Sequence, residues 1–527
     1  MFRLRRSLTA AAAAACSAAL FLTACGGSNS DSGTPGGSSV EAGDPVAGGT
    51  LRVIQITEPR SLDPAKLSNT WIHQNLLGNG LYGALLTNNE ALEIQGELAE
   101  GFSTTDGGST FTLKLRPSLT FTDGTPLDAA AVKFNWDRLR DPATASEAIR
   151  QASQISAVDV VDPTTLKVTM VAPTPHFDQA LIASSMNWIA SPTALQKGPA
   201  VFDEAPVGAG PFTLVKWTRG DTIELTKNPA YYDPPKPYLD GITIRTVADL
   251  NQRINTMTTG GADLSSETSL ANVDKAEDAG LYTEVVPTGG GQYVAMNFRR
   301  APFQDERARE AVALAVDLDA VNMVAYNGKG EVPKTLFQDS SPFFADVALP
   351  TPDKEAAQKL FDELAAEGKP VSFTFVSYPT TESKMVGEAL QAQLSAFKNV
   401  EVKVEVLEFA QAAARASAKD FDMILSSAVI QDPDFALRTP FHSASQVGNI
   451  AGVKDKELDA ALDTGRTSQL ADERKAAYET AQERLIELNP GLWYIRATPS
   501  VTAAENVHGI QVYTLASILP EELWITK

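Results

Sequence analysis

The clearest hydrophobic pattern in the chain predicts alternating strands and helices. Residues 371–376 alternate between apolar and polar, as in a half-buried strand, and residues 400–406 repeat that period. Between them, apolar residues recur at helical spacing from about Glu382 to Phe397. A second helix over Phe409 to Lys419 leads to a third strand, Phe421 to Ser427. This order with short connections indicates parallel crossovers, so we expect an α/β lobe built on an open parallel sheet.

A second unit of the same kind occurs earlier in the chain. Ile242 to Thr246 has the strand period, Asp249 is placed to cap a helix, and Gly260-Gly261 ends that helix before Ala262-Asp263-Leu264. Two α/β units far apart in the sequence predict two lobes with a cleft between them.

The stretch from Thr87 to Phe202 has a different pattern and predicts a mixed α+β insert. Phe111 to Leu115 alternates as a strand, and Asp123-Gly124 is a turn signal. Val158 to Thr169 predicts a hairpin that turns at Asp162-Pro163.

The sequence predicts two further helices, one near the C-terminus and one around Gly78. Apolar residues from Tyr478 to Leu488 form one amphipathic stripe, which Asn489-Pro490 stops. Gly78 to Gly83 matches the pattern G-x-G-x-x-G, but a dinucleotide site needs a strand before it. Trp71 to Leu77 is typical of a helix instead, so these glycines predict close helix packing or a bend.

The first residues have the order of an export signal. Basic residues open the chain, an apolar run from Leu8 to Phe21 follows, and Leu22-Thr23-Ala24-Cys25 comes next. The run is too short to span a bilayer as a helix. A small residue before a cysteine is similar to the bacterial lipobox, so we expect residues 1–24 to be a lipoprotein signal peptide and Cys25 to be lipidated. The alternative is an ordinary secretory signal with an incidental cysteine.

Composition fits an exported, tethered protein with a core of its own. The chain has 527 residues, and its only other cysteine, Cys16, is lost with the signal, so no intrachain disulfide is expected. Residues 25–48 are rich in Gly, Ser, Asp and Pro and predict a flexible tether. The formal net charge of −21 argues against a nucleic-acid partner.

Motifs for catalysis or metal binding are weak. The four histidines, His73, His176, His442 and His508, show no metal-ligand spacing. The nucleophile and metalloprotease motifs G-x-S-x-G and H-E-x-x-H do not occur. Acidic pairs arise by chance among 65 acidic residues. We therefore expect no catalytic residue, no metal and no cofactor. The rival from another class is a secreted hydrolase that uses an acidic pair.

The predicted sheets locate a binding cleft. Ligands of open parallel sheets lie beyond the carboxyl ends of the strands. The loops at those ends are Ser377–Ser383, Glu408–Gln411, Ala428–Asp434, Thr57–Leu62 and Ser265–Leu270. They make Tyr378, Gln431, Asp432 and Asp434 cleft candidates, each of which has an ordinary capped turn as its alternative.

Several blocks in order resemble the extracellular solute-binding proteins of ABC importers, family 5, the peptide/nickel type. The blocks are Gly48-Gly49-Thr50-Leu51 with Leu62-Asp63-Pro64, Phe121 to Leu127 running into Val132 to Trp136, Pro206 to Phe212, Asn228 to Tyr232, Asn297-Phe298 with Pro302-Phe303, and Arg307 through Asp317. The similarity runs from about Gly48 to the C-terminus.

The resemblance implies an α/β, periplasmic-binding-protein-like clamshell of type II, large cluster, with an additional α+β domain. Lobe I would be discontinuous (49–86, 204–296 and 498–527), the extra domain would span 87–203, and lobe II would span 297–497. It also implies that a solute is enclosed between the lobes and delivered to a permease and ATPase complex by a monomer. Export would leave the protein lipid-anchored on the outer face of the cytoplasmic membrane.

The sequence departs from the peptide-binding pattern of that family at one position. Peptide-binding relatives carry an aspartate four residues before the proline of an acidic-Pro pair, where it anchors the free amine. Here the pair is Asp432-Pro433, and the corresponding position is Val429. The arginine that holds the carboxylate in some relatives is also absent from Ser377–Ser383. An oligopeptide or peptide-like solute remains the first expectation, with a nickel chelate, an oligosaccharide or another small organic molecule as alternatives.

Position in the family pattern and the loop rule together give the expected ligand-binding residues. They are Ser68, Asn69, Thr70, Trp71, Tyr293, Met296, Asn297, Tyr378, Ser426, Ser427, Val429, Gln431, Asp432 and Asp434. The sequence leaves open the ligand's identity and length, the export route (general or twin-arginine), and a further role in feeding a sensor.

Overall fold

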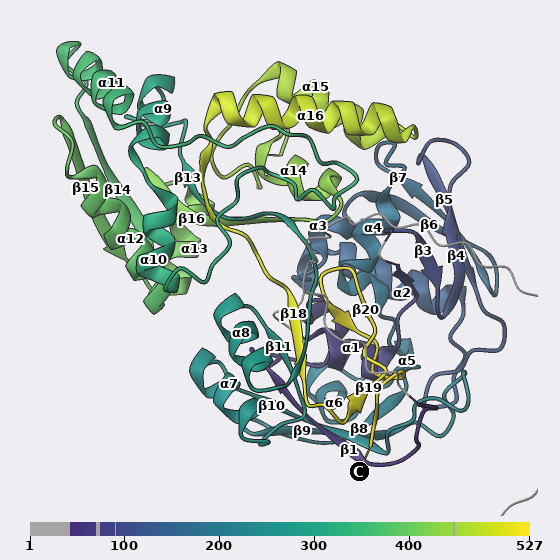
Figure 1. Ribbon diagram of the computed structural model, residues 1–527. Helices are drawn as coiled ribbons and strands as arrows, with labels where there is room; N and C mark the ends of the chain where they lie inside the picture. Colours follow the sequence, from purple (N-terminus) through teal and green to yellow (C-terminus); the bar gives the residue numbers. More distant parts are fainter. Residues whose placement is uncertain (1–42, 70–73, 90, 446–447, 527) are drawn as a thin grey trace, which may run out of the picture. The chain divides into compact units, whose positions relative to one another are not determined.

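The computed structural model describes residues 43–69, 74–89, 91–445 and 448–526, and it contains two large mixed sheets (Figure 1). Cys25, the signal peptide and most of the expected tether lie outside the described residues. Among the helices that are described, none is both long and apolar enough to cross a membrane.

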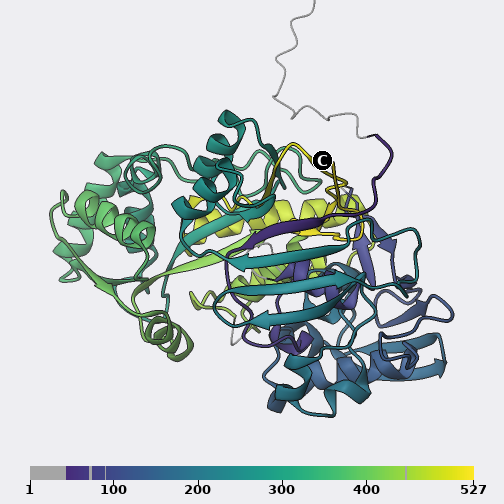
Figure 2. The same cartoon turned by 90° about the horizontal axis from the view of Figure 1, so that it is seen from below.

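The first sheet has seven strands and is assembled from distant parts of the chain. In spatial order its strands are β12 (Tyr282–Val285), β18 (Ser500–Ala503), β11 (Leu264–Glu267), β1 (Thr50–Gln55), β10 (Gly241–Thr246), β9 (Thr222–Lys227) and β8 (Phe212–Thr218). The central strand β1 pairs in parallel with β10 and β11, and the outer pairs are antiparallel. Figure 2 shows β1 lying beside strands that come much later in the sequence. This sheet is therefore made from three separate segments of the chain, and the part built on it is called lobe I below.

The predicted earlier α/β unit is confirmed in this sheet. Helix α7 (Leu250–Thr258) connects β10 to β11, and the side chain of Asp249 accepts a hydrogen bond from Gln252 N at its start. Helix α8 (Leu270–Asp278) follows β11.

The second sheet has five strands and confirms the strand–helix order predicted for residues 371–430. Its spatial order is β15 (Val400–Val406), β14 (Val371–Ser377), β16 (Met423–Ile430), β13 (Gly289–Met296) and β17 (Gly491–Ile495). Helices α12 (Thr381–Leu394) and α13 (Phe409–Ala418) make the connections between parallel strands.

The second sheet differs from the expectation at β13. This strand runs antiparallel between β16 and β17, so the sheet is mixed rather than parallel. β13 belongs to lobe II, so the chain crosses at residues 286–288 rather than after Met296. The strand opens with Gly289-Gly290-Gly291, which carry no hydrophobic period to read. Gly290 has φ +63°, and a Cβ there would lie 2.1 Å from Ala428 O, so only glycine fits this pairing.

The insert has its own antiparallel sheet of four strands. Their spatial order is β4 (Ala99–Ser103), β5 (Thr110–Leu115), β7 (Thr165–Met170) and β6 (Ile155–Asp162). The predicted hairpin is confirmed, since β6 and β7 pair and turn at Asp162-Pro163. Phe102, Phe111 and Trp136 pack in the core of this region.

The remaining elements complete the lobes. Short strand pairs are β2 (Leu86–Asn88) with β3 (Ile94–Gly96), β19 (Val507–His508) with β22 (Trp524–Ile525), and β20 (Val512–Tyr513) with β21 (Ser517–Ile518). Up to the insert's end, helices are α1 (Asn75–Tyr82), α2 (Ala129–Arg140), α3 (Ile149–Ala152), α4 (Phe177–Ile182), α5 (Pro192–Leu195) and α6 (Pro199–Glu204). Lobe II adds α9 (Glu306–Ala315), α10 (Leu318–Tyr326), α11 (Lys354–Ala366), α14 (Pro433–Phe441), α15 (Lys456–Thr467) and α16 (Ala471–Leu488).

Two sequence motifs have the roles expected of them. Gly78 lies inside α1, and a Cβ there would be 2.3 Å from the Trp188 ring, so the glycine permits close packing and is not part of a dinucleotide loop. Helix α16 ends at Asn489, which has a left-handed backbone, directly before Pro490.

The chain crosses between the large sheets twice, and Arg496 joins the two crossings. The first crossing connects β12 to β13 and the second connects β17 to β18. Arg496 is buried, and its guanidinium donates to Thr288 O at 3.4 Å, to Thr335 O at 3.1 Å and to Glu331 Oε1 at 2.7 Å. One side chain thereby fixes both crossing segments to lobe II.

Candidate functional site

The carboxyl end of β16 emerges from the lobe II core. Along this strand, Met423 and Leu425 pack into one hydrophobic cluster and Ile424, Ala428 and Ile430 into another, so the two faces alternate. The face of Met423 and Leu425 continues through Ser427, which is exposed, and Val429, which is half-buried. These two expected ligand contacts therefore lie at the end of the strand where the hydrophobic core no longer covers that face. Ser426, on the other face, is half-buried.

A hairpin of lobe I connects two expected site residues that are distant in sequence. Gln431, directly after β16, donates from Nε2 to Thr514 O at 2.7 Å, and Thr514 Oγ1 donates to Gln431 Oε1 at 3.2 Å. Asn69 Nδ2 donates to the hydroxyl of Tyr513 at 3.0 Å. Tyr513 and Thr514 belong to the β20–β21 hairpin, residues 512–518, so this hairpin is where the two halves of the expected site meet.

Beneath that hairpin lies a dense network of neutral polar groups. Asn79 Oδ1 accepts from Trp188 Nε1 at 2.8 Å and from Tyr513 OH at 3.0 Å, and its Nδ2 donates to Ile518 O at 2.7 Å. Ser517 Oγ donates to Asn69 Oδ1 at 2.7 Å. All five side chains are buried. Because such groups are costly to leave unpaired, the network fixes the hairpin to helix α1.

The acidic residues after Gln431 form ion pairs within lobe II. Asp432 caps helix α14 by accepting from Asp434 N at 2.9 Å. Its carboxylate also accepts two hydrogen bonds from Arg474 Nη2, at 2.7 and 2.8 Å. The structure thus supports the capped and paired alternative for Asp432, and its expected role as a ligand contact stays a prediction.

Asp434 is in a different electrostatic state. Its side chain is buried, Oδ1 accepts no hydrogen bond from the described residues, and the nearest cation, Arg466 Nη1, is 3.8 Å from Oδ1. Burial raises the pKa of this carboxyl to about 6, against the attraction of Arg466.

The insert contributes two groups beside this loop that sequence reasoning missed. Asp178 on α4 accepts a hydrogen bond from Gln179 N, and burial raises its pKa to about 6, with the negative charge of Asp432 raising it further. Burial and the charge of Arg474 lower the pKa of His176. Neither residue has sequence spacing that points to lobe II, because their proximity to α14 depends on tertiary structure.

Four expected ligand contacts make packing or hydrogen-bond contacts within lobe II. Tyr293 is fully buried against Trp493, with ring centroids 4.6 Å apart, and burial raises its pKa to about 12. Met296 lies in the core on the opposite face of β13. Asn297 Nδ2 donates to Phe421 O at 2.8 Å and so connects β13 to the start of β16. Tyr378 is half-buried beside both lobe II clusters. Their roles as ligand contacts stay predictions.

The expected loop 68–71 is partly outside the described residues. Thr70 and Trp71 fall there, and Ser68 O accepts from Gln74 N at 3.3 Å across that segment. The contact joins the described residues on either side of that segment.

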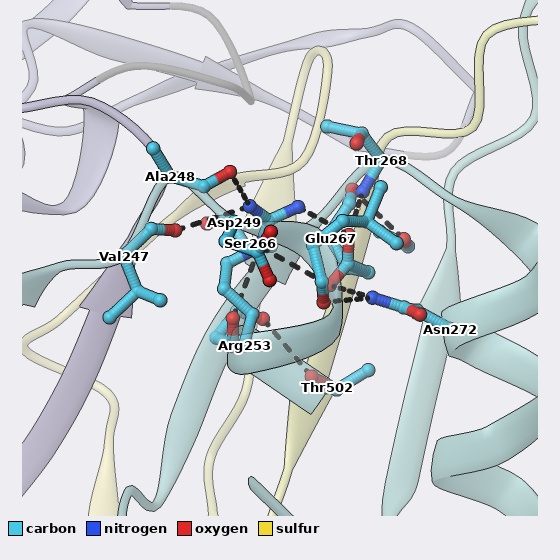
Figure 3. A network of polar contacts seen from close by, with 12 residues as sticks. Val247, Ala248, Asp249, Arg253, Ser266, Glu267, Thr268, Asn272 and Thr502 are labelled. Carbon is cyan, nitrogen blue, oxygen red and sulfur yellow. Dashed lines mark hydrogen bonds and ion pairs between the residues drawn. The ribbon is translucent and has the colours of Figure 1, made fainter. Parts of the chain in front are cut away.

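The expected loop Ser265–Leu270 of lobe I is held by a buried ion pair (Figure 3). Arg253 Nη2 contacts Glu267 Oε1 at 2.9 Å, and Asn272 Nδ2 donates to Glu267 Oε2 at 3.0 Å. Thr268 N donates to the same carboxylate, and Thr498 Oγ1 donates to Thr268 O at 2.9 Å. The loop is therefore fixed to the second crossing segment.

The described residues contain no group of three or more His, Cys, Asp or Glu side chains that could hold a metal ion. What they offer at the hairpin and the β16 loop is a set of amide, hydroxyl and carboxylate groups from both lobes. Such groups suit noncovalent recognition of a small polar molecule.

Two lobes joined by two crossing segments are the architecture of a two-lobed ligand-binding protein. Comparison with known proteins identifies the family. Residues 93–447 match the model of the bacterial extracellular solute-binding proteins, family 5. The chain belongs to this family, is non-enzymatic, and is a solute-binding component of an ABC importer.

The chain is similar to proteins that bind different ligands. The glutathione-binding protein GsiB of Shigella boydii serotype 4 is 29% identical over 446 residues, covering 82% of this chain and 85% of the relative. AgaA from A. tumefaciens R10, solved with agropinic acid, is 25% identical with a TM-score of 0.77, covering 91% and 99%. NikA from Brucella suis, solved with Fe(III)-EDTA, is 25% identical with a TM-score of 0.77, covering 91% and 100%.

Proposed function

We propose that the chain captures an oligopeptide or peptide-like solute between its lobes and delivers it to a membrane permease. The observation that carries the location is the hydrogen-bonded contact between Gln431 of lobe II and Thr514 of lobe I. A solute that binds beside this contact touches both lobes, so it binds the closed form better than the open form and shifts the population toward closure. The similarity to a glutathione-binding protein supports a peptide-like ligand.

A non-peptide solute is the second candidate, and Val429 favours it. The family's peptide-binding members have a carboxylate at this position, and here an aliphatic side chain lies half-buried opposite Gly290. A charged amine would find no partner at Val429, which would cost affinity for free peptides.

A thermal-shift screen followed by calorimetry tests the proposal. The probes are glutathione, di- and tripeptides, agropinic acid, a nickel–histidine complex and Fe(III)-EDTA. We expect saturable stabilisation by the peptide-like probes, with one solute bound per chain. Stabilisation by only the opine or the chelates would establish the second candidate. If no probe raised the melting temperature, the assignment of the ligand to these classes would be wrong.

We also propose that Cys25 is lipidated and anchors the mature protein to the outer face of the cytoplasmic membrane. The support is the charge order and the Leu22-Thr23-Ala24-Cys25 motif of the sequence. The expected result for Cys25→Ser in the native host is release of the protein from the membrane fraction. A variant that stayed in the membrane fraction with the same mass shift as the wild type would contradict the anchor.

A further inference from the structure

The C-terminal turn of helix α15 contacts the insert through directional hydrogen bonds. Arg466 Nη2 donates to Gln154 Oε1 at 2.5 Å and to Thr174 Oγ1 at 2.7 Å. Two residues later, Ser468 O lies 3.0 Å from His176 Nε2. A carbonyl oxygen only accepts, so this nitrogen carries the hydrogen. Lobe II and the insert are thus joined at one point by side chains distant in sequence.

The guanidinium of Arg466 is directed away from its own lobe. Its only ion pair within the described residues is with Asp434, at 3.8 Å, and that carboxylate oxygen accepts no hydrogen bond from them. Its Nη2 donates two hydrogen bonds, and both go to the insert. Asp434 therefore supplies the opposite charge for a partly buried guanidinium, while the insert supplies the hydrogen-bond acceptors.

The chemistry of this contact suits repeated opening and closing. The groups that meet are a guanidinium, an amide, a hydroxyl, an imidazole and the backbone carbonyl of Ser468. Water can hydrogen-bond to each of them when they separate. An apolar interface of similar extent would expose hydrophobic surface on opening and resist it. A charge-assisted hydrogen bond changes an equilibrium by roughly tenfold, which is enough to shift a population without locking it.

We propose that Arg466, Gln154, Thr174 and His176 form a latch that closes the insert onto lobe II and sets the closed fraction of the protein without solute. The latch goes beyond the proposed function, because it acts before any solute is bound. Solute then needs to supply less of the closing free energy, and its apparent affinity rises with the closed fraction.

The test measures closure directly in the absence of solute. Spin labels are placed at Val161→Cys in the insert and Met323→Cys in lobe II, both exposed positions, in the mature chain carrying Cys25→Ser. Because the chain has no other cysteine after the signal, only these two sites are labelled. Distance distributions then report the closed and open populations.

We expect Arg466→Gln to lower the ratio of closed to open protein by about tenfold. The matched control is Arg438→Gln, which removes an arginine whose partner, Asp463, lies within lobe II at 3.1 Å. Unchanged distances in Arg466→Gln, or equal changes in both variants, would overturn the latch.

A second variant keeps the test decisive if Arg466→Gln does not fold. Gln154→Ala removes an acceptor on the insert side, and we expect it to open the protein by several-fold. Combining it with Arg466→Gln should add little, because both remove the same contact. Fully additive effects, or no effect of Gln154→Ala, would contradict the proposal. If the latch proposal fails, the proposed solute binding is unaffected, because the thermal-shift screen tests it separately.

Discussion

The two sides of the candidate site are built from different chemistry. On the lobe I side, Asn69, Asn79 and Tyr513 are neutral, buried and joined by hydrogen bonds. On the lobe II side, Asp434 is buried, its Oδ1 accepts no hydrogen bond from the described residues, and its pKa is raised. Its ion-pair partner Arg466 donates its hydrogen bonds to the insert. The lobe I network makes its hydrogen bonds among its own buried groups, so we expect it to be rigid. The lobe II charges depend on hydrogen bonds to the insert, so their environment changes when the insert moves.

The largest effect should come from breaking the neutral platform. Asn79→Leu leaves Trp188 Nε1, Tyr513 OH and Ile518 O without their partner in a buried site, so we expect a loss of about 4–5 kcal/mol in the free energy of unfolding. Chemical denaturation measures it. The exposed helical Asn255 gives the control, and its replacement by alanine should change stability by less than about 0.5 kcal/mol. Comparable losses in both would show that the network is not the source.

A slightly smaller loss is expected from the buried ion pair of lobe II. Arg474→Leu removes the two hydrogen bonds that Arg474 donates to the Asp432 carboxylate, and we expect a cost of about 3–4 kcal/mol. Arg438→Leu breaks a more exposed pair with Asp463 and should cost less than about 1 kcal/mol. Equal costs by urea denaturation would contradict the distinction.

The charged groups around the loop Asp432–Asp434, which include Asp178 of the insert, should give the stability a pH dependence that the neutral network does not. Asp178 has a pKa of about 6 in the folded protein, above its ordinary value of 3.8. The folded state then binds this proton more tightly, so the group's contribution to stability is lost as pH rises from about 4 to 6. Between pH 4 and pH 7.5, the free energy of unfolding of Asp178→Asn should therefore rise by up to about 3 kcal/mol relative to that of the wild type. Parallel stability curves for the two proteins would refute the assigned shift.

The smallest effect is expected where the two sides touch. Gln431→Ala removes the amide that bonds to Thr514, with an expected loss of about 1 kcal/mol in the free energy of closure and a several-fold weaker solute affinity. Gln252→Ala, at an exposed position on helix α7 outside the expected site, serves as the control. Calorimetry with the solute found in the screen would show the difference, and identical affinities would exclude Gln431 from the site.

Local patterns were enough to predict much of the fold. The period of residues 371–376 and 400–406, the cap at Asp249 and the stop at Asn489-Pro490 each depend on neighbours in sequence, and each is confirmed. The lobe bounds that the resemblance implies place β13 in lobe I, whereas its partners β16 and β17 are strands of lobe II. Tertiary structure decides this pairing, and the three glycines that begin β13 give no pattern that predicts it.

The site was harder to predict because its contacts are made between domains. Gln431 followed from the rule that ligands lie beyond strand ends, but its partner Thr514 lies in a hairpin that has no such signal. No motif or spacing in the sequence singles out Arg466, Arg474 or Asp178. His176 is one of four histidines without metal-ligand spacing. Only the folded chain shows that these four lie around the loop Asp432–Asp434.

The central claim is that the protein holds a small molecule and releases it unaltered. The most direct measurement is native mass spectrometry of the protein purified from its own cells, before and after gentle unfolding. The account predicts a one-to-one adduct that leaves as an intact small molecule and rebinds to the refolded chain. A protein that carried no adduct and bound none from a complete extract of its growth medium, or one that returned a chemically changed molecule, would contradict it.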